Sequence, residues 1–230
     1  MDIARWFLGE QRLSPEVWSV GGRVGYVDDA ETPNTQIVYH SYGDSKLIFE
    51  VRGLPASAKD RKRPQFMGAE IGVVVHCEEG HVLVSNSRSK VAAYDKAGKE
   101  VKSWSGSSNH FENFISAVRS RKPEDLNAEI LEGHLSSALC HTGNISYRVG
   151  EPQDPETIRK AIAGHPDAAK TWDRMIDHLK KNNVDPAKSS LTLGPALKMN
   201  PETERFIGHA KANKLLTRDY REPYVVPMIG

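Results

Sequence analysis

A change of pattern near residue 105 constrains the fold of this chain more than any other feature. From residue 17 to residue 105 the sequence is a series of short β-type runs separated by tight turns, and after residue 109 it reads as helix. Short strands joined by tight turns pair antiparallel, because parallel strands need long crossovers. Strands first and helices after predict an α+β fold and not a doubly wound one.

The strand region contains six clear runs. Each is bounded by turn-forming residues, and they cover residues 36–43, 46–53, 71–77, 82–86, 91–94 and 100–104. In the second run Leu47, Phe49 and Val51 alternate with other residues, which is the period of a half-buried strand. The pattern predicts an open, mainly antiparallel sheet.

Helices are expected to flank this sheet. The sequence predicts them over residues 1–9, 111–121, 127–148, 155 onward, 166–183 and 200–216, with caps at Asn109, Asp154 and Asn200 and a stop at Gly9. We therefore expect one α+β domain over residues 1–150. Residues 151–230 should form a helical extension that packs on it.

The charge balance argues against two classes of partner. Lys plus Arg number 31 and Asp plus Glu number 30, which gives a net charge of +1. Neither nucleic acid nor an anionic membrane is expected to bind, because no field of one sign attracts it. No apolar run approaches the ~20 residues that span a bilayer, and the first residues lack the pattern of a signal peptide. The sequence assigns no compartment, and we expect Cys77 and Cys140 to be two buried thiols.

No cofactor or metal motif is complete in this chain. Residues 21–25 are rich in glycine, but no helix follows them, so they do not form a dinucleotide-binding loop. A β-bulge or a tight turn is the expected use of these glycines. His134 and His141 are seven residues apart, about 10 Å along a helix, and cannot share a metal ion. We expect no metal site.

The long helix predicted over residues 127–148 carries a polar stripe beside its apolar one. The stripe expected to face the core is Leu131, Leu135, Ala138, Thr142, Ile145 and Val149, and the polar one is His134, Ser137, His141 and Asn144. Gly133, Ser137 and Cys140 lie along its edge, where another backbone could approach closely. Two interpretations stay open: a seam of helix packing, or a polar wall that faces a substrate or a neighbouring domain.

A second candidate region is the loop between the first helix and the sheet. Residues 28–35 hold three acids and several turn formers, which are typical of a solvated loop. Clustered carboxylates and amides also bind sugar hydroxyls through hydrogen bonds. Arg23 and Asn34 are the weaker candidates for contact with a substrate here.

Several long strings resemble one known family. They are HFENF at 110–114, AVRSRK at 117–122, EGHLSSALCH at 132–141, GNISYR at 143–148 and DIARWFLG at 2–9, with shorter ones at 21–23, 31–35 and 215–221. The chain resembles the bacterial-type carboxy-terminal domain of the glucose-fructose oxidoreductase / inositol dehydrogenase (Gfo/Idh/MocA) family. The resemblance covers nearly the whole chain.

This resemblance implies a function that is divided between two domains. Family members carry an amino-terminal Rossmann domain that binds NAD or NADP, followed by a catalytic lysine and a histidine three residues before an aspartate. Asp2 matches that aspartate and would contact substrate hydroxyls, while the open sheet would serve assembly into a homo-oligomer. The helix over residues 1–9 has an end but no cap, so we expect the chain to continue upstream of Met1 into this domain.

The sequence thus predicts the substrate-binding and oligomerisation domain of an NAD(P)-dependent oxidoreductase that acts on sugar-like or cyclitol hydroxyls. The candidate site residues are Asp2, His134, His141, Arg23 and Asn34. Alone, the chain is expected to bind no cofactor and to be inactive. Two alternatives stay open: a free-standing carbohydrate-binding or scaffold domain, and part of an enzyme that cleaves glycosides with the help of NAD.

Overall fold

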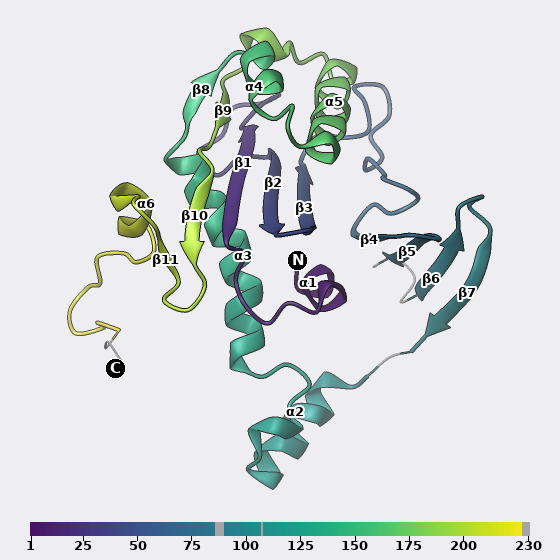
Figure 1. The fold of residues 1–230 in the computed structure, drawn as a ribbon, viewed down its shortest axis with the longest axis vertical. Coiled ribbons are helices and arrows are strands. Elements are labelled where there is room, and N and C mark those ends of the chain that lie inside the picture. The colour runs from purple at the N-terminus through teal and green to yellow at the C-terminus, as the bar shows by residue number, and fades with distance from the viewer. Residues whose placement is uncertain (86–89, 107, 227–230) are drawn as a thin grey trace.

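The computed structural model describes residues 1–226 except 86–89 and 107, and it confirms the α+β class (Figure 1). The first half contains α1 (Asp2–Leu8), β1 (Glu16–Gly22), β2 (Thr35–Tyr42), β3 (Ser45–Arg52), β4 (Gly72–Cys77), β5 (Gly80–Ser85), β6 (Lys90–Asp95), β7 (Glu100–Ser105) and α2 (His110–Ser120). The second half contains η2 (Pro123–Asp125), α3 (Ile130–Arg148), β8 (Glu151–Gln153), α4 (Pro155–Ala161), α5 (Pro166–Lys181), η3 (Pro186–Lys188), β9 (Leu191–Leu193), β10 (Leu197–Asn200), β11 (Arg205–Phe206) and α6 (Ala210–Lys214).

The first sheet has the strand order β11-β10-β1-β2-β3, and β9 joins β8 to the end of β1. Its pairings are antiparallel, as expected from the tight turn between β2 and β3. Helix α3 crosses one face, and α4 and α5 cover the other (Figure 1). Both faces of β1 and β2 are therefore buried.

Alternation along the strands builds a separate core on each face. Trp18 and Ile37 point toward Trp172 of α5, whereas Val38 points toward Leu139 of α3. This arrangement explains why β1 and β2 read as nearly continuous buried runs. A strand that is covered on both faces buries its side chains at nearly every position, here including the polar Ser19, Gln36 and His40.

Helix α3 approaches the sheet through small residues near its end. A Cβ atom added at Gly143 would lie 2.5 Å from Cγ1 of Val38. Ser146 Oγ accepts a hydrogen bond from the backbone N–H of Ser19 at 3.0 Å. The small-residue edge predicted at Gly133, Ser137 and Cys140 is exposed in this chain, so close approach of another backbone there stays a prediction. Sequence periodicity located a small-residue edge but not the one that meets β1 and β2.

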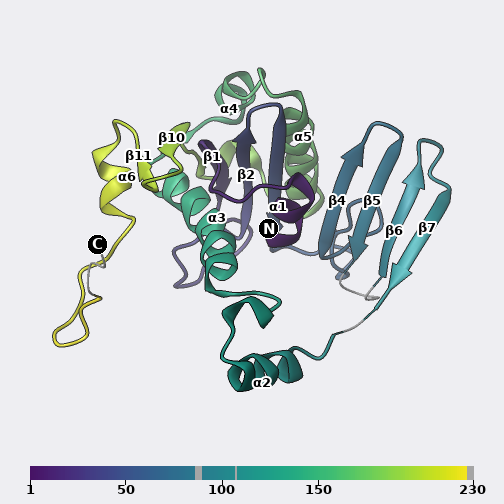
Figure 2. The ribbon, with the colours of Figure 1, turned by 60° about the horizontal axis from the view of Figure 1, so that its bottom comes forward.

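The second sheet, with the order β4-β5-β6-β7, is less well covered (Figure 2). The cross-strand register places seven apolar side chains on one of its faces: Val73, Val75, Val82, Val84, Val91, Ala93 and Trp104. Six are half-buried, Trp104 is exposed, and none belongs to either buried core.

Several local predictions are confirmed by cap geometry. Gly9 follows α1 in the left-handed region at φ 72°, and the side chains of Asn109 and Asp154 cap α2 and α4. The helix predicted to open at Asn200 is wrong. Asn200 ends β10, and its side chain accepts hydrogen bonds in the turn that leads to β11, so only α6 remains helical.

Three smaller findings complete the comparison with the sequence. Both cysteines are exposed, so the expectation of buried thiols is wrong. Asn86, predicted as the end of a strand, lies outside the described residues. Among the described helices, none is both long and apolar enough to cross a membrane.

The division of the chain at residue 150 stays a prediction. Residues 151–230 supply strands as well as helices, because β9 and β10 both pair with β1. Ile158 of α4 and Trp172 of α5 lie in the same core as Trp18. The second part of the chain therefore completes the first sheet and contributes to both of its cores.

Candidate functional site

Helix α1, which carries Asp2, is held to the body by a buried arginine. The Arg5 side chain is fully buried and donates hydrogen bonds to the backbone oxygen of Glu10, at 2.6 Å, and to the Glu132 carboxylate on α3. Trp6 Nε1 donates to the same carboxylate at 2.7 Å. Because the Arg5 and Trp6 side chains of the short helix both bind Glu132, they fix α1 against α3 (Figure 1).

Asp2 itself lies at the first position of this anchored helix. Its side chain is 47% exposed, and its Oδ1 accepts the backbone N–H of Ile3 at 2.8 Å. The carboxylate keeps free acceptor positions for a hydroxyl. Glu132 is different, because hydrogen bonds from Trp6 and Arg5, both to its Oε2, hold the pKa of its carboxyl below the ordinary value.

The His134 side chain contacts another part of the same chain. Its Nε2 lies 2.7 and 2.9 Å from the two carboxylate oxygens of Glu204, in the turn between β10 and β11. Arg12 pairs with Glu202 in the same turn. His141 is exposed and makes no hydrogen bond to a described residue. In the polar stripe, His134 is therefore bound to the β10–β11 turn, whereas His141 is exposed on the surface.

Arg23 and Asn34 close the acidic loop upon itself. Arg23 pairs with the Asp28 carboxylate and donates to the backbone oxygen of Thr32 at 2.8 Å. The hydrogen bond from Arg23 lowers the pKa of Asp28. Asn34 is buried at the base of the loop. Its Nδ2 donates a hydrogen bond to the backbone oxygen of Val24 at 2.8 Å, and its Oδ1 accepts one from the backbone N–H of Val24 at 3.1 Å. Both side chains stabilise the loop.

The five candidates do not meet at one place. α1 precedes β1 and Arg23 follows it, and seven residues of strand separate these two ends by about 20 Å. His134 lies near the first end, because its neighbour Glu132 binds Arg5 and Trp6. Two residues turn a helix by about 200°, so His134 projects from the side of α3 opposite Glu132 and α1. Asp2 and His134 therefore lie on different sides of α3, and Arg23 and Asn34 lie at the other end of β1.

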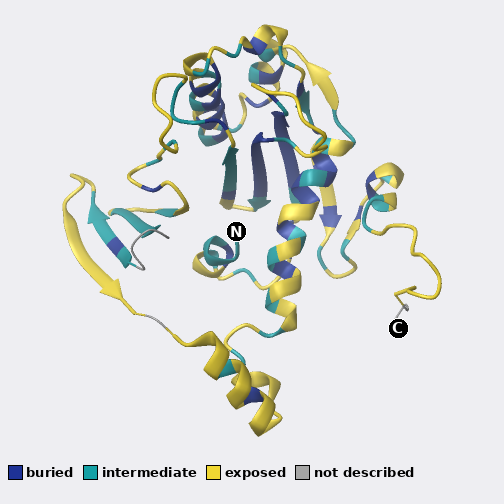
Figure 3. Ribbon diagram, turned by 180° about the vertical axis from the view of Figure 1, so that it is seen from behind, coloured by how far each residue is buried: buried dark blue, intermediate teal, exposed yellow. Residues whose placement is uncertain are grey.

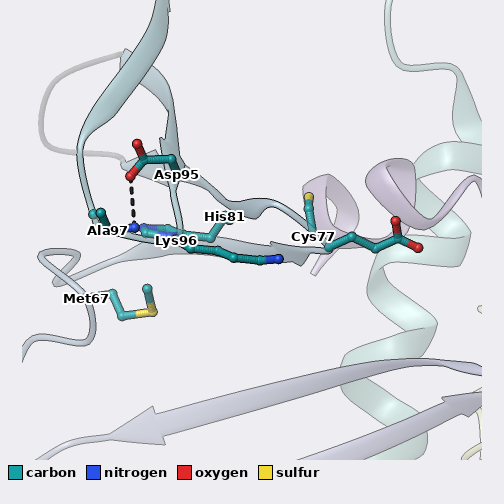
Figure 4. Close-up of a pocket in the computed structure, with 9 residues that line it drawn as sticks. Met67, Cys77, His81, Asp95, Lys96 and Ala97 are labelled. Carbon is teal, nitrogen blue, oxygen red and sulfur yellow. Dashed lines mark hydrogen bonds between the residues drawn. The ribbon is translucent and has the colours of Figure 1, made fainter.

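Two hollows of the described surface lie elsewhere. One of about 450 Å³ opens at the β4–β5 and β6–β7 turns and is lined by Met67, Cys77, His81, Asp95 and Lys96 among others (Figure 4). Another of about 440 Å³ lies between α4 and α5. Neither contains a candidate residue, and no group of three metal-binding side chains occurs among the residues described.

Two buried polar residues in or beside α1 were not predicted from the sequence. Arg5 is one, and the other is His40 on β2, whose Nδ1 lies 3.0 Å from Ser14 Oγ. Burial lowers the pKa of His40 to about 4, so its imidazole is neutral at pH 7. For Arg5 the available signal was a basic residue between the apolar Ala4 and Trp6, and for His40 it was a titratable residue within a β-type run.

The glycines at the end of β1 do not fit a dinucleotide. A Cβ atom at Gly21 would lie 2.3 Å from the Thr35 oxygen, and one at Gly22 would lie 2.7 Å from the Ser190 oxygen. Both pair in regular register with β2, so the predicted β-bulge or turn is wrong for these two glycines, whereas Gly25 lies in a bend at φ 85°. They permit close packing of neighbouring backbones, and no helix begins between Arg23 and Asn34.

Comparison of the chain with protein-family models, with curated proteins and with solved structures finds no match. The resemblance described above therefore stays a prediction.

Proposed function

We propose that this chain is the substrate-side and assembly domain of an NAD(P)-dependent oxidoreductase that acts on sugar-like or cyclitol hydroxyls. The observation that carries the proposal is the position of Asp2. The residue that the resemblance assigns to substrate contact begins a helix immobilised by Arg5 and Glu132, and its carboxylate is half exposed. A fixed carboxylate accepts hydrogen bonds from hydroxyls with defined direction.

The cofactor would belong to a separate nucleotide-binding domain. The glycines at the end of β1 do not fit a dinucleotide, and no helix follows them closely enough to receive its phosphates. The part proposed for this chain is to bind and orient the substrate, and the hydride chemistry would depend on that other domain.

The second sheet supports the assembly part of the proposal. Its seven apolar side chains form one continuous face across four strands. Such a face, rimmed by polar turns, is typical of a surface that pairs with another protein. A second copy of the chain would cover it with an identical face and give the expected homo-oligomer.

Weak binding of a polyol tests the substrate part. We would titrate the labelled chain with myo-inositol and with glucose and follow amide shifts by NMR. Asp2→Asn should abolish the shifts on α1, and Asp44→Asn, which changes an exposed acid in the β2–β3 turn, should preserve them. Equal responses of the two variants would contradict the role of Asp2.

Titration with NADH tests the cofactor part separately. The fluorescence of NADH should show no saturable change at micromolar concentrations. Saturable binding would contradict the assignment of the cofactor to another domain. Micromolar affinity for a sugar, without any partner, would instead favour a free-standing carbohydrate-binding protein.

A surface substitution tests the assembly part. Val84→Lys places a charge in the middle of the apolar sheet face and should lower the sedimentation coefficient of the chain. Val27→Lys, on a fully exposed loop position, should leave it unchanged. If both variants sediment like the unmodified chain, the sheet face is not an interface.

A further inference from the structure

Helix α2 is exposed along most of its length and lies remote from the first sheet (Figure 3). Phe111, Phe114, Ile115 and Val118 follow the helical spacing i, i+3, i+4, i+7 and are 72%, 58%, 46% and 46% exposed. The opposite side is already in use, because the Asn113 side chain hydrogen bonds to Asp125 and Asn127. The exposed side therefore has no cover among the described residues.

Two charges of opposite sign border this apolar face. Glu112 and Arg119 are seven residues apart, nearly two turns, so they lie on the same flank of α2. Neither side chain forms an ion pair with a described residue. The negative charge is near the beginning of the helix and the positive charge is near its end.

We propose that α2 pairs antiparallel with α2 of a second copy of this chain. A two-fold axis between antiparallel helices brings the same flank of each helix together, so Glu112 of one copy faces Arg119 of the other, twice. The four apolar side chains of each helix cover one another. A parallel pair would place these charged flanks on opposite sides of the seam and leave all four charges unpaired.

This interface differs from the sheet face and does not depend on the proposed function. An 11-residue helix is about 16 Å long, so two of them bury less than the ~800 Å² per partner of a standard interface. We expect weak pairing, with a dissociation constant on the order of tens of micromolar.

Charge reversal tests the pairing by sedimentation equilibrium. Every variant also carries Val84→Lys, which removes the sheet face from the measurement. Glu112→Arg alone and Arg119→Glu alone should each raise the dissociation constant about tenfold, because like charges then face each other. The double variant should restore it. An equimolar mixture of the two single variants should form heterodimers in preference to homodimers.

Disulfide trapping tests the orientation. With Cys77→Ser and Cys140→Ser in place, Ile115→Cys lies close to the two-fold axis and should cross-link under mild oxidation. Phe111→Cys should not, because antiparallel pairing offsets the two sulfurs by about 13 Å. Equal cross-linking at both positions would indicate a parallel pair and overturn the proposal.

Substitution of the apolar face gives the remaining control. Phe114→Asp should abolish the pairing, whereas Phe7→Asp, which alters an exposed phenylalanine on α1, should not. Circular dichroism establishes that each variant is folded. If Phe114→Asp does not fold, the charge-reversal variants test the pairing in its place. The proposal is overturned if the four charge states sediment alike, or if the chain is monomeric and instead binds vesicles of anionic lipid through Phe114.

Discussion

The two sheets of this chain have strands of similar apolar content but very different cover. β1 and β2 lie between α3 on one face and α4 and α5 on the other, and nearly all their side chains are buried. In β4 to β7, Ala92 is the one side chain described as buried, and β7 is exposed throughout. Equal apolar content thus leads to a closed core in one sheet and to an open surface in the other.

This difference separates stability from association. Burial of apolar area stabilises the fold by about 25 cal/mol per Å², and that area is concentrated in the first sheet. The second sheet retains apolar area that a partner can still bury. Substitutions in the first sheet should change the free energy of unfolding, and those in the second should change assembly.

The largest expected effect compares two tryptophans. Trp172→Ala removes a ring that is 2% exposed in the core of the first sheet, and it should cost about 3–5 kcal/mol of unfolding free energy. Trp104→Ala removes a 45% exposed ring from the second sheet and should cost less than about 1 kcal/mol. Urea unfolding measures both, and equal costs would show that the second sheet is also part of a closed core.

Acid should act on the first sheet through His40. Because the pKa of His40 is about 4 in the folded chain and 6.5 in the reference state, the unfolded chain binds the extra proton first. Stability should fall as pH drops from about 6.5 to 4, by on the order of 3 kcal/mol. His40→Gln should flatten this slope, and His81→Gln in the second sheet should not. An unchanged slope in His40→Gln would contradict the assignment.

A smaller effect compares two glycines of α3. Gly143→Ala inserts a methyl group 2.5 Å from Val38 and should destabilise the chain by about 1–3 kcal/mol. Gly133→Ala, on the open side of the same helix, meets no atom within 4 Å and should stabilise it by up to about 1 kcal/mol. Thermal melts of the two variants should therefore shift in opposite directions.

The smallest effects concern the two histidines of the polar stripe. His134→Ala removes the exposed contact with Glu204 and should cost about 0.2–1 kcal/mol. His141→Ala should change the unfolding free energy by less than about 0.5 kcal/mol, because its ring is exposed. A large melting shift for His141→Ala would restore the packing interpretation of the stripe.

Local features of the fold were predictable because their causes are local. Gly9 stops α1, Asn109 and Asp154 cap helices, and Gly43 turns between β2 and β3, all within a few residues of chain. Asn200 shows the limit. Its side chain caps a turn as well as it would cap a helix, and pairing of β10 with the distant β1 selected the strand.

The candidate site was less predictable for the same physical reason. Asn34 has the chemistry of a sugar ligand, but its amide is used by Val24, and His134 is used by Glu204, 70 residues away. Only the folded chain decides which polar side chains remain free. No periodicity indicates that Arg5 is buried and paired across 127 residues with Glu132.

The sequence by itself determined the α+β class, the antiparallel hairpins and most helix ends, because these depend on periodicity, turn residues and caps within short segments. Only the tertiary structure decided that α3 meets the sheet at Gly143, that residues 151–230 complete the first sheet, and that α2 and the second sheet remain open. These outcomes depend on which distant surfaces fit together, and packing is selected over the whole chain at once.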